Sequence, residues 1–343
     1  MDFSNAFDTI NHNISLSKLK AYVIWGPPPP GVGKIYMSGR QQFVLYNQSS
    51  FFIYINDMVN VSKLLFYVLF ADDSNVFLSG KNIDEVISKI NEALVGLVEW
   101  LNANKLTLNV KKTHFMVFDT ARSSNQINNQ VIINGQVIDR VDSTKFLGVL
   151  LDSKLNFKKH IAHVRSKVSK GIYILGRARK FFDEITLKNL YYAFIHPYFT
   201  YCREVWGGTF DTYLRPLEIL QKRALRIIAG VPYKYHTFEL FQRYNIVQSK
   251  NLHKYSLYIF LYKLRNNLLP RNIISSFTFN NQIHHHSTRQ ADKLHVNKYG
   301  SEPRKRSLRH QCSLLYNNNV AVDYSVSAAS FKFVIKTILF NNN

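Results

Sequence analysis

Two adjacent aspartates, Asp72 and Asp73, follow an apolar run that begins at Leu64 and ends at Phe70. A second apolar stretch, residues 76–78, comes directly after them. This pattern predicts a strand, a tight turn and a second strand, with both carboxylates at the tip. Two acids at the end of a buried strand are costly unless a cation binds them, and a hard cation such as Mg²⁺ prefers oxygen ligands. The alternative is an ordinary hairpin turn, because Asp, Ser and Asn are common turn residues.

A second candidate for chemistry is the segment 31–34, Gly-Val-Gly-Lys, which resembles part of a phosphate-binding loop. That loop requires a glycine, four further residues, and then Gly-Lys followed by Ser or Thr. Pro28 stands where the first glycine belongs, and Ile35 stands where the hydroxyl belongs. The prolines at residues 27–30 have no N–H groups to donate to a phosphate. A rigid proline-rich connector is therefore the favoured interpretation, and a P-loop NTPase is a remote alternative.

The whole chain carries a large positive charge. Its 343 residues include 44 Lys and Arg against 22 Asp and Glu, which gives a formal net charge of +22. This surplus favours a polyanionic partner, most simply nucleic acid.

No apolar run reaches the roughly 20 residues that a transmembrane helix needs, so we expect no membrane partner. Cys202 and Cys312 make neither a zinc pattern nor a disulfide framework, and no signal peptide is visible. These features indicate a reduced, intracellular protein of the nucleus or cytoplasm.

A long amphipathic helix is expected soon after the paired acids. Apolar residues recur at helical spacing from Ile83 to Leu101. Asn82 and Glu85 are placed to form an N-terminal capping pair for this helix. Short strands are predicted on both sides of residue 120, at residues 106–110, 115–118, 131–133 and 146–152.

From about residue 156 the pattern changes to long amphipathic helices that are rich in Lys and Arg. One of these helices is predicted at residues 214–229, with Pro216 in its first turn and Gly230 as its stop. A last short helix is predicted at residues 327–340. The second half of the chain is thus expected to be mainly helical.

Further segments match a known enzyme family when they are taken together with the paired acids. Residues 2–12, Asp-Phe-Ser-Asn-Ala-Phe-Asp-Thr-Ile-Asn-His, place an acid and an aromatic five residues apart. Residues 100–113 run from Trp-Leu-Asn to Lys-Lys-Thr, and residues 146–149 are Phe-Leu-Gly-Val. With Phe-Ala-Asp-Asp at residues 70–73, these motifs resemble the reverse transcriptases of non-LTR (LINE-type, jockey-like) retrotransposons. The resemblance continues through residues 190–197, 220–224 and 330–332, and so covers nearly the whole chain.

The resemblance implies an α+β fold. It predicts an incomplete reverse-transcriptase palm, with an antiparallel sheet and helices on one face, followed by a mainly helical thumb. The expected domains are a partial palm at residues 1–153, a thumb-like region at 154–271 and a basic, irregular C-terminal region with a short terminal helix at 272–343.

The activity that the resemblance implies is RNA-directed DNA polymerisation. Its partners would be an RNA template, a DNA primer and deoxynucleotides, with two Mg²⁺ ions and no small-molecule cofactor. By resemblance, Asp2 and Asp72 hold the metal ions and Asp73 assists, so these three residues are both metal ligands and catalytic groups.

Other site residues follow from the same resemblance. Lys112 would give charge or a proton to the leaving pyrophosphate, although a solvated strand residue is a serious alternative. Phe7 would exclude a 2′-hydroxyl by its bulk, although core packing is the alternative from the residue alone. Phe70 and Ala71 are expected to contact the nucleotide.

Basic side chains of the first thumb helix are expected to line a phosphate backbone. These contacts would position nucleic acid without reading its sequence and would weaken with salt, and a solvated basic face is the alternative. The residues are Lys158, Lys159, Arg165, Lys167, Lys170, Arg177, Arg179 and Lys180.

The sequence also departs from the family pattern in ways that bear on activity. The family has a Gly-Pro-Gln-Gly segment and a helix that form the floor of the nucleotide pocket, but here Ser50 continues directly into residues 51–57, which resemble only the end of that helix. Asp2 has one residue before it, where the family has a buried strand and the fingers. We expect no polymerase activity from the chain alone. A nucleic-acid-binding remnant without chemistry and a decayed retrotransposon fragment are the alternatives.

Overall fold

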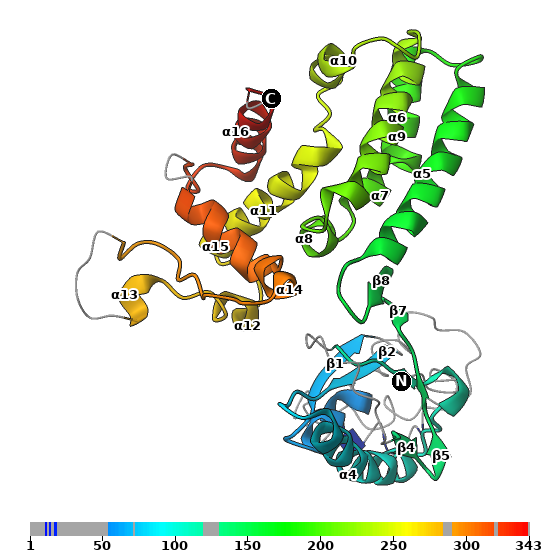
Figure 1. The fold of residues 1–343 in the computed structure, drawn as a ribbon, viewed down its shortest axis with the longest axis vertical. Coiled ribbons are helices and arrows are strands. Elements are labelled where there is room, and N and C mark those ends of the chain that lie inside the picture. The colour runs from blue at the N-terminus through cyan, green and yellow to red at the C-terminus, as the bar shows by residue number, and fades with distance from the viewer. Residues whose placement is uncertain are drawn as a thin grey trace, which may run out of the picture. The chain divides into compact units, whose positions relative to one another are not determined.

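The computed structural model describes residues 11, 14, 17–18, 54–70, 73–118, 130–283, 290–318 and 322–341. These residues fall into two compact units, which Figure 1 shows. The first unit runs to Asp142, apart from residues 118–120, and the second unit runs from Ser143. Both helices and strands are present, which confirms the expected mixture of the two. The division falls ahead of residue 153, where the sequence places the end of the palm.

The first unit combines short strands with one long helix. Its elements are η1 (Asn56–Asn60), β1 (Phe66–Phe70), β2 (Asp73–Phe77), α4 (Ile83–Ala103), η2 (Val110–Lys112), β3 (His114–Phe115), β4 (Ile132–Ile133), β5 (Gln136–Val137) and β6 (Asp139–Arg140). β1 pairs with β2 and β4 with β5 in antiparallel fashion, whereas β3 and β6 are parallel. The described strands therefore form separate pairs and not one continuous antiparallel sheet.

The helix α4 contributes much of the core of the first unit, as its apolar spacing predicts. Leu94 and Leu97 on its buried face pack in a cluster with Tyr54 and Ile133. Burying apolar side chains of this size contributes roughly 1.5–3 kcal/mol each, relative to exposure.

At the start of α4 the predicted Asn82 cap is present, but the predicted role of Glu85 in the capping pair is not. The side-chain oxygen of Asn82 accepts a hydrogen bond from the backbone N–H of Asp84 at 2.9 Å, which satisfies one free donor of the first turn. Glu85 pairs with Lys89 one turn further on. The predicted N-cap is confirmed. The Glu85 side chain forms an ion pair with Lys89 in place of the predicted contact with the start of the helix.

The predicted strand at residues 106–110 is wrong. Leu106 is buried, Leu108 and Val110 pack partly against the same cluster as α4, and Val110 begins the 3-10 helix η2. Within residues 106–110 a single β-bridge forms, at Leu108. Alternate residues of a connecting segment can thus face a core without forming a strand, and this produces the same apolar alternation that indicates a strand.

The second unit is mainly helical, as expected. Its elements are β7 (Ser143–Phe146), β8 (Val149–Asp152), α5 (Lys158–Ala178), α6 (Glu184–Phe194), α7 (His196–Thr200), α8 (Arg203–Trp206), α9 (Asp211–Ala229), α10 (Phe238–Arg243), α11 (Ser249–Arg265), α12 (Arg271–Ile274), α13 (Asn280–Ile283), α14 (Glu302–Lys305), α15 (Leu308–Asn318) and α16 (Ala328–Asn341). α5 and α9 lie along each other (Figure 1). The core around them includes the fully buried side chains of Tyr191, Phe199 and Trp206.

Residues 143–152 form a hairpin, where the sequence predicts a single strand over residues 146–152. β7 and β8 pair antiparallel, with Phe146 opposite Val149. The two residues between them, Leu147 and Gly148, have φ values of 43° and 83°. Positive φ at both central positions matches the right-handed twist of a two-residue hairpin. A leucine seldom adopts such a φ, so the apolar run concealed the turn.

The ends of α9 show one confirmed and one wrong prediction. Gly230 stops the helix with a φ of 67°, as expected for a glycine in the left-handed region. Pro216 does not begin the helix, because α9 starts at Asp211 and contains the proline. The proline removes one backbone donor there, and the helix continues because Leu217, Leu225 and the rest of its apolar face are buried.

Candidate active site and nucleic-acid surface

Asp73, the second of the paired acids, is the first residue of β2, directly after the connection from β1. In this antiparallel hairpin Phe70 lies opposite Asp73, so residues 71 and 72 connect the two strands. Asp73 is exposed at the first position of β2. The two predicted strands are confirmed, and their pairing brings Phe70 and Asp73 together, whereas the predicted turn at residues 71–72 lies outside the described residues.

The apolar strand that leads to the acids is less buried than expected. No residue of β1 is fully buried, and Phe66, Phe70 and Phe77 are exposed. The cause is the two-residue period of a strand, which turns Tyr67 and Leu69 toward the core and leaves the other face outside. Asp73 shares that outer face with its cross-strand partner Phe70.

Several predicted site residues lie outside the described residues. They are Asp2, Phe7, Ala71 and Asp72, together with the proline-rich segment at residues 27–35. Within the part of the chain that the structure describes, no three His, Cys, Asp or Glu side chains gather to hold a metal ion. A carboxylate such as that of Asp73 is the kind of ligand that Mg²⁺ prefers, so this residue fits that ion chemically.

Lys112 lies in a short 3-10 helix and not in a strand. It is the exposed last residue of η2, and its backbone N–H donates to the Asn109 side chain at 3.3 Å. Its carbonyl oxygen lies 3.1 Å from Nδ1 of His114. The backbone at Lys112 is therefore held by its neighbours on both sides.

The predicted basic residues of α5 all lie at its surface. Ile161, Val164 and Val168 form the buried face of the helix. Lys159, Lys170 and others recur on the opposite side, and every predicted cation from Lys158 to Lys180 is exposed. An amphipathic helix of this kind presents a row of positive charge to solvent.

Three of these cations also have structural contacts. Lys158 lies over the ring of Tyr213 in α9, at 5.9 Å from the centroid. Arg179 donates from Nη1 to the carbonyl oxygen of Ile228 at 2.7 Å, in the last turn of α9. A cation at a helix C-terminus satisfies a free carbonyl and matches the helix dipole. Lys159 donates from Nζ to the hydroxyl of Ser143 at 2.8 Å. These contacts connect α5 to α9 and to the β7–β8 hairpin.

The turn of the β7–β8 hairpin is fastened to the helices that follow it. The hydroxyl of Tyr201 donates to the carbonyl oxygen of Leu147 at 2.6 Å. A Cβ atom at Gly148 would lie 3.1 Å from the Tyr201 ring, so the close approach favours glycine. His160 accepts at Nδ1 from the backbone N–H of Leu150 at 3.3 Å. Sequence reasoning missed both partners, because Tyr201 is 54 residues from Leu147 and no spacing rule connects His160 with Leu150.

Asp152 fixes the connection between this hairpin and α5. Its carboxylate accepts hydrogen bonds from the backbone N–H groups of Lys154, Asn156 and Phe157, at 3.2, 3.1 and 2.7 Å. The hydroxyl of Thr209 donates to the Asn156 carbonyl at 2.6 Å. An Asp shortly before the first helical residues was the available signal for this loop.

A buried polar cluster is centred on Arg203, the first residue of α8. Arg203 is completely buried, its guanidinium lies 4.2 Å from the ring centroid of Trp206, and Nη2 donates to the Ser249 carbonyl at 3.0 Å. Within the described residues, its Nε and Nη1 have no hydrogen-bond partner. Burial lowers the pKa of Arg203 to about 9. Burial is also the largest cause that lowers the pKa values of His160, His196 and His253 to about 4.

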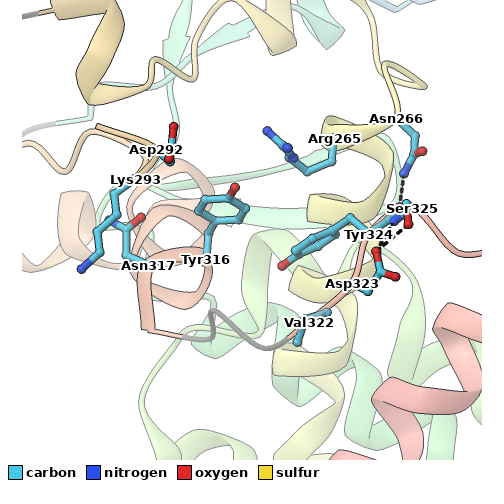
Figure 2. Close-up of a pocket in the computed structure, with 10 residues that line it drawn as sticks. All are labelled: Arg265, Asn266, Asp292, Lys293, Tyr316, Asn317, Val322, Asp323, Tyr324 and Ser325. Atoms are coloured by element: carbon cyan, nitrogen blue, oxygen red, sulfur yellow. Dashed lines mark hydrogen bonds between the residues drawn. The ribbon is translucent and has the colours of Figure 1, made fainter. Parts of the chain in front are cut away.

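The second unit also contains a cavity of about 620 Å³. Figure 2 shows it between the end of α11, the end of α15 and the segment before α16. Arg265 lies over the rings of Phe279 and Tyr316, at 5.4 and 5.8 Å from their centroids. The cavity is lined by two cations and two carboxylates, Arg265, Lys293, Asp292 and Asp323. Because these charges offset one another, the cavity does not extend the positive surface of α5.

Comparison with known proteins supports the resemblance that the sequence motifs indicate. Residues 1–151 match the family model described as "Reverse transcriptase (RNA-dependent DNA polymerase)". This region, somewhat less than half of the chain, is therefore similar to reverse transcriptases. The predicted resemblance is thereby confirmed, and the reverse transcriptase region includes the β1–β2 hairpin.

Curated relatives of the chain are polymerases of mobile elements. The chain is 27% identical to an RNA-directed DNA polymerase from mobile element jockey of Drosophila melanogaster, over 50% of this chain and 19% of that protein. It is 26% identical to the jockey polymerase of Drosophila funebris, over 60% of this chain and 23% of that protein. It is 24% identical to a probable RNA-directed DNA polymerase from transposon X-element of Drosophila melanogaster. This alignment spans 261 residues and covers 67% of this chain and 28% of that protein.

The extent of these matches defines what the similarity covers. An alignment of 261 residues is longer than the first unit, so the similarity to the X-element polymerase continues into the helical second unit. The chain spans less than a third of the length of each of these relatives. None of the solved structures matches the chain. Among the described residues, no helix has the length and apolar character needed to cross a membrane.

Proposed function

We propose that this chain is the palm and thumb portion of a non-LTR retrotransposon reverse transcriptase. The observation that carries the proposal is the β1–β2 hairpin, which sets Asp73 opposite Phe70 inside a region that matches the family. The substrates would be deoxynucleotides, an RNA template and a DNA primer. Asp2 and Asp72 would bind the metal ions, and Asp73 would assist. When bound there, two Mg²⁺ ions would stabilise the attacking and leaving oxygens of nucleotidyl transfer.

The helical second unit is proposed to be the thumb. Its exposed α5 cations suit the phosphate backbone of a template–primer duplex. The β7–β8 turn corresponds by resemblance to the strand that grips the primer. In this proposal the domains remain a palm at residues 1–153, a thumb at 154–271 and a basic C-terminal region at 272–343. The grip hairpin would then be the part of the palm that packs on the thumb.

We further propose that the chain alone binds nucleic acid and does not extend a primer. Ser50 continues directly into residues that resemble only the end of the helix at the floor of the nucleotide pocket. Without this floor, the base and sugar of a nucleotide would not be held in line for attack.

Primer extension on an RNA template in the presence of Mg²⁺ tests this proposal. The expected result is no incorporation by the purified chain and unchanged hybrid binding in Asp72→Ala. Incorporation by the chain that disappears in Asp72→Ala would show that the site is complete and would overturn the proposed inactivity.

Binding of an RNA–DNA hybrid tests the thumb separately. Lys167→Glu combined with Lys170→Glu should weaken binding and reduce its dependence on salt, because two phosphate contacts are lost. The matched control is Lys298→Glu combined with Lys332→Glu, which makes the same charge change at two exposed positions outside α5. Equal weakening by both pairs would indicate general charge attraction and would contradict a specific α5 surface.

A further inference from the structure

The most exposed large apolar side chains of the described residues gather at one end of the second unit. Phe181, Tyr233 and Ile185 are 80%, 73% and 71% exposed. Phe181 lies in the connection between α5 and α6, Ile185 lies in the first turn of α6, and Tyr233 lies in the connection between α9 and α10. Monomeric proteins seldom leave clustered apolar surface open to water unless it has a partner.

The contacts between these segments hold them at the same end of the bundle. Arg179 at the end of α5 donates to the Ile228 carbonyl near the end of α9. Arg243 at the end of α10 pairs with Glu184 at the start of α6, with Nη2 and Oε1 2.8 Å apart. Figure 1 shows the α5–α6 and α9–α10 connections at this end. We call the exposed apolar side chains here the aromatic end, which consists of Phe181, Phe182, Ile185, Tyr233 and Phe238.

Cations outnumber acids around the aromatic end, although Asp183 and Glu239 are also exposed there. Lys180 and Lys234 are exposed beside it. Arg226 lies over the ring of Tyr233, at 5.4 Å from the centroid, and its Nε donates to the Tyr235 carbonyl at 2.9 Å. Glu184, an acid of this region, is already paired with Arg243. The surface is therefore complementary to a polyanion that also offers flat apolar groups.

Unpaired nucleic acid has this combination of chemistry. Proteins that bind single strands stack successive bases on aromatic side chains and contact the backbone with cations. The aromatic end is continuous with the basic face of α5, because Arg177 and Lys180 are exposed on that helix and the residues directly after it. A backbone that follows α5 would therefore bring its next bases to Phe181.

We propose that the aromatic end binds unpaired bases of a nucleic-acid strand whose backbone lies along α5. This inference rests on the proposed nucleic-acid function of the second unit and adds a site for single-stranded bases beyond the duplex contacts. Phe181 and Tyr233 supply the stacking surfaces, and Lys180 and Lys234 supply the charges for the adjacent phosphates.

The test uses the full chain and an oligouridylate of about twelve nucleotides, within the usual site sizes for such surfaces. Affinity is measured by fluorescence anisotropy, against an abasic strand of the same length that keeps the phosphates. Phe181→Ala combined with Tyr233→Ala should weaken oligouridylate binding about tenfold and leave abasic-strand binding unchanged, since stacking is lost and charge is kept. Tyr233→Phe should bind as the unmodified chain does, because the ring remains.

The matched control is Phe333→Ala, which removes a 68% exposed phenylalanine from α16 in the same unit. It should bind oligouridylate normally. Equal affinity for the oligouridylate and the abasic strand, or no loss in the double variant, would overturn the proposal. Binding to anionic lipid vesicles or self-association that depends on Phe181, without oligouridylate binding, would also overturn it and identify the other occupant.

These outcomes separate the inference from the proposed function. Hybrid binding that requires Lys167 and Lys170, together with unaltered oligouridylate binding in the double variant, would retain the thumb and reject the aromatic end. Oligouridylate binding that depends on Phe181, in a chain that does not bind hybrid, would retain the aromatic end and reject the thumb.

Discussion

Two groups of aromatic side chains, one in each unit, lie in opposite environments. In the second unit, Tyr191, Phe199 and Trp206 are fully buried among long helices. In the first unit, Phe66, Phe70 and Phe77 of the β1–β2 hairpin are exposed on a two-stranded ribbon. A helix can bury its apolar stripe against a sequence neighbour, whereas a strand pair needs further strands or a helix over each face. The comparison teaches that the helices cover their own aromatic side chains, whereas the two-stranded hairpin that carries Asp73 leaves one face exposed.

The largest expected effect compares two phenylalanines, one from each unit. Phe199→Ala should reduce the free energy of unfolding of the second unit by about 3–5 kcal/mol, because it removes a buried ring and leaves a cavity. Phe66→Ala should cost less than about 1 kcal/mol, since that ring is exposed on β1. Urea unfolding followed by circular dichroism measures both changes. Similar losses in the two variants would show that the hairpin face is covered in the folded protein.

The next prediction concerns acid and the second unit. His160, His196 and His253 have folded pKa values of about 4, below the ordinary value of 6.5. Between these values the unfolded chain binds more protons than the folded one, so stability is full above pH 6.5 and is lost as the pH falls toward 4. Each unit of pKa corresponds to about 1.4 kcal/mol, which makes the total loss several kcal/mol.

Melting temperature measured across this pH range tests the prediction. His196→Phe keeps an aromatic ring beside Tyr191 and Tyr192 and removes one titrating group, so its melting temperature should fall less between pH 6.5 and 4. A melting temperature that stays constant over the range would contradict the burial of these imidazoles.

A smaller effect of opposite sign is expected at Arg203. Arg203→Met should stabilise the second unit by about 1–3 kcal/mol, because it removes buried donors without partners and keeps a side chain of similar length. Arg165→Met, which makes the same change at an exposed position of α5, should alter stability by less than about 0.5 kcal/mol. Thermal unfolding measures both variants. A lower melting temperature for Arg203→Met would show that its contacts with Ser249 and Trp206 outweigh the cost of burial.

The smallest effect tests whether the Tyr201 hydroxyl restrains the turn of the β7–β8 hairpin. Tyr201→Phe removes the hydrogen bond to Leu147 and should lower the free energy of opening the hairpin by about 0.5–1.5 kcal/mol. Amide hydrogen exchange at Val149 and Leu150 reports this opening, and Tyr198→Phe serves as a neighbouring control. Unchanged exchange in Tyr201→Phe would mean that the hydroxyl does not restrain the turn.

The sequence predicted the elements whose signals are local. The apolar spacing of α4, its Asn82 cap, the stop of α9 at Gly230 and the hairpin before Asp73 all depend on residues close along the chain. The predictions failed where a local pattern has two physical causes. Apolar alternation near Leu108 came from a packed connecting segment, and an apolar run from residue 146 concealed a turn at Leu147.

For the candidate site, sequence reasoning found residue types and missed their supports. It placed Phe70 and Asp73 in one hairpin, and the register confirms this. The roles of Asp73 and Lys112, and the metal role of Asp2 and Asp72, stay predictions. Tyr201, His160 and Arg203 were missed because their contacts join segments far apart in the sequence, where no spacing rule applies.

The attachment of the β7–β8 turn to the helices has a mechanical consequence. Hydrogen bonds of Tyr201, His160 and Asp152 hold the hairpin and the following loop to the helices of the second unit. The boundary between the two units therefore lies before the hairpin, between Asp142 and Ser143. The turn and the start of α5 are therefore expected to move together as one rigid body. Any group that this turn contacts would then keep its position relative to the cations of α5.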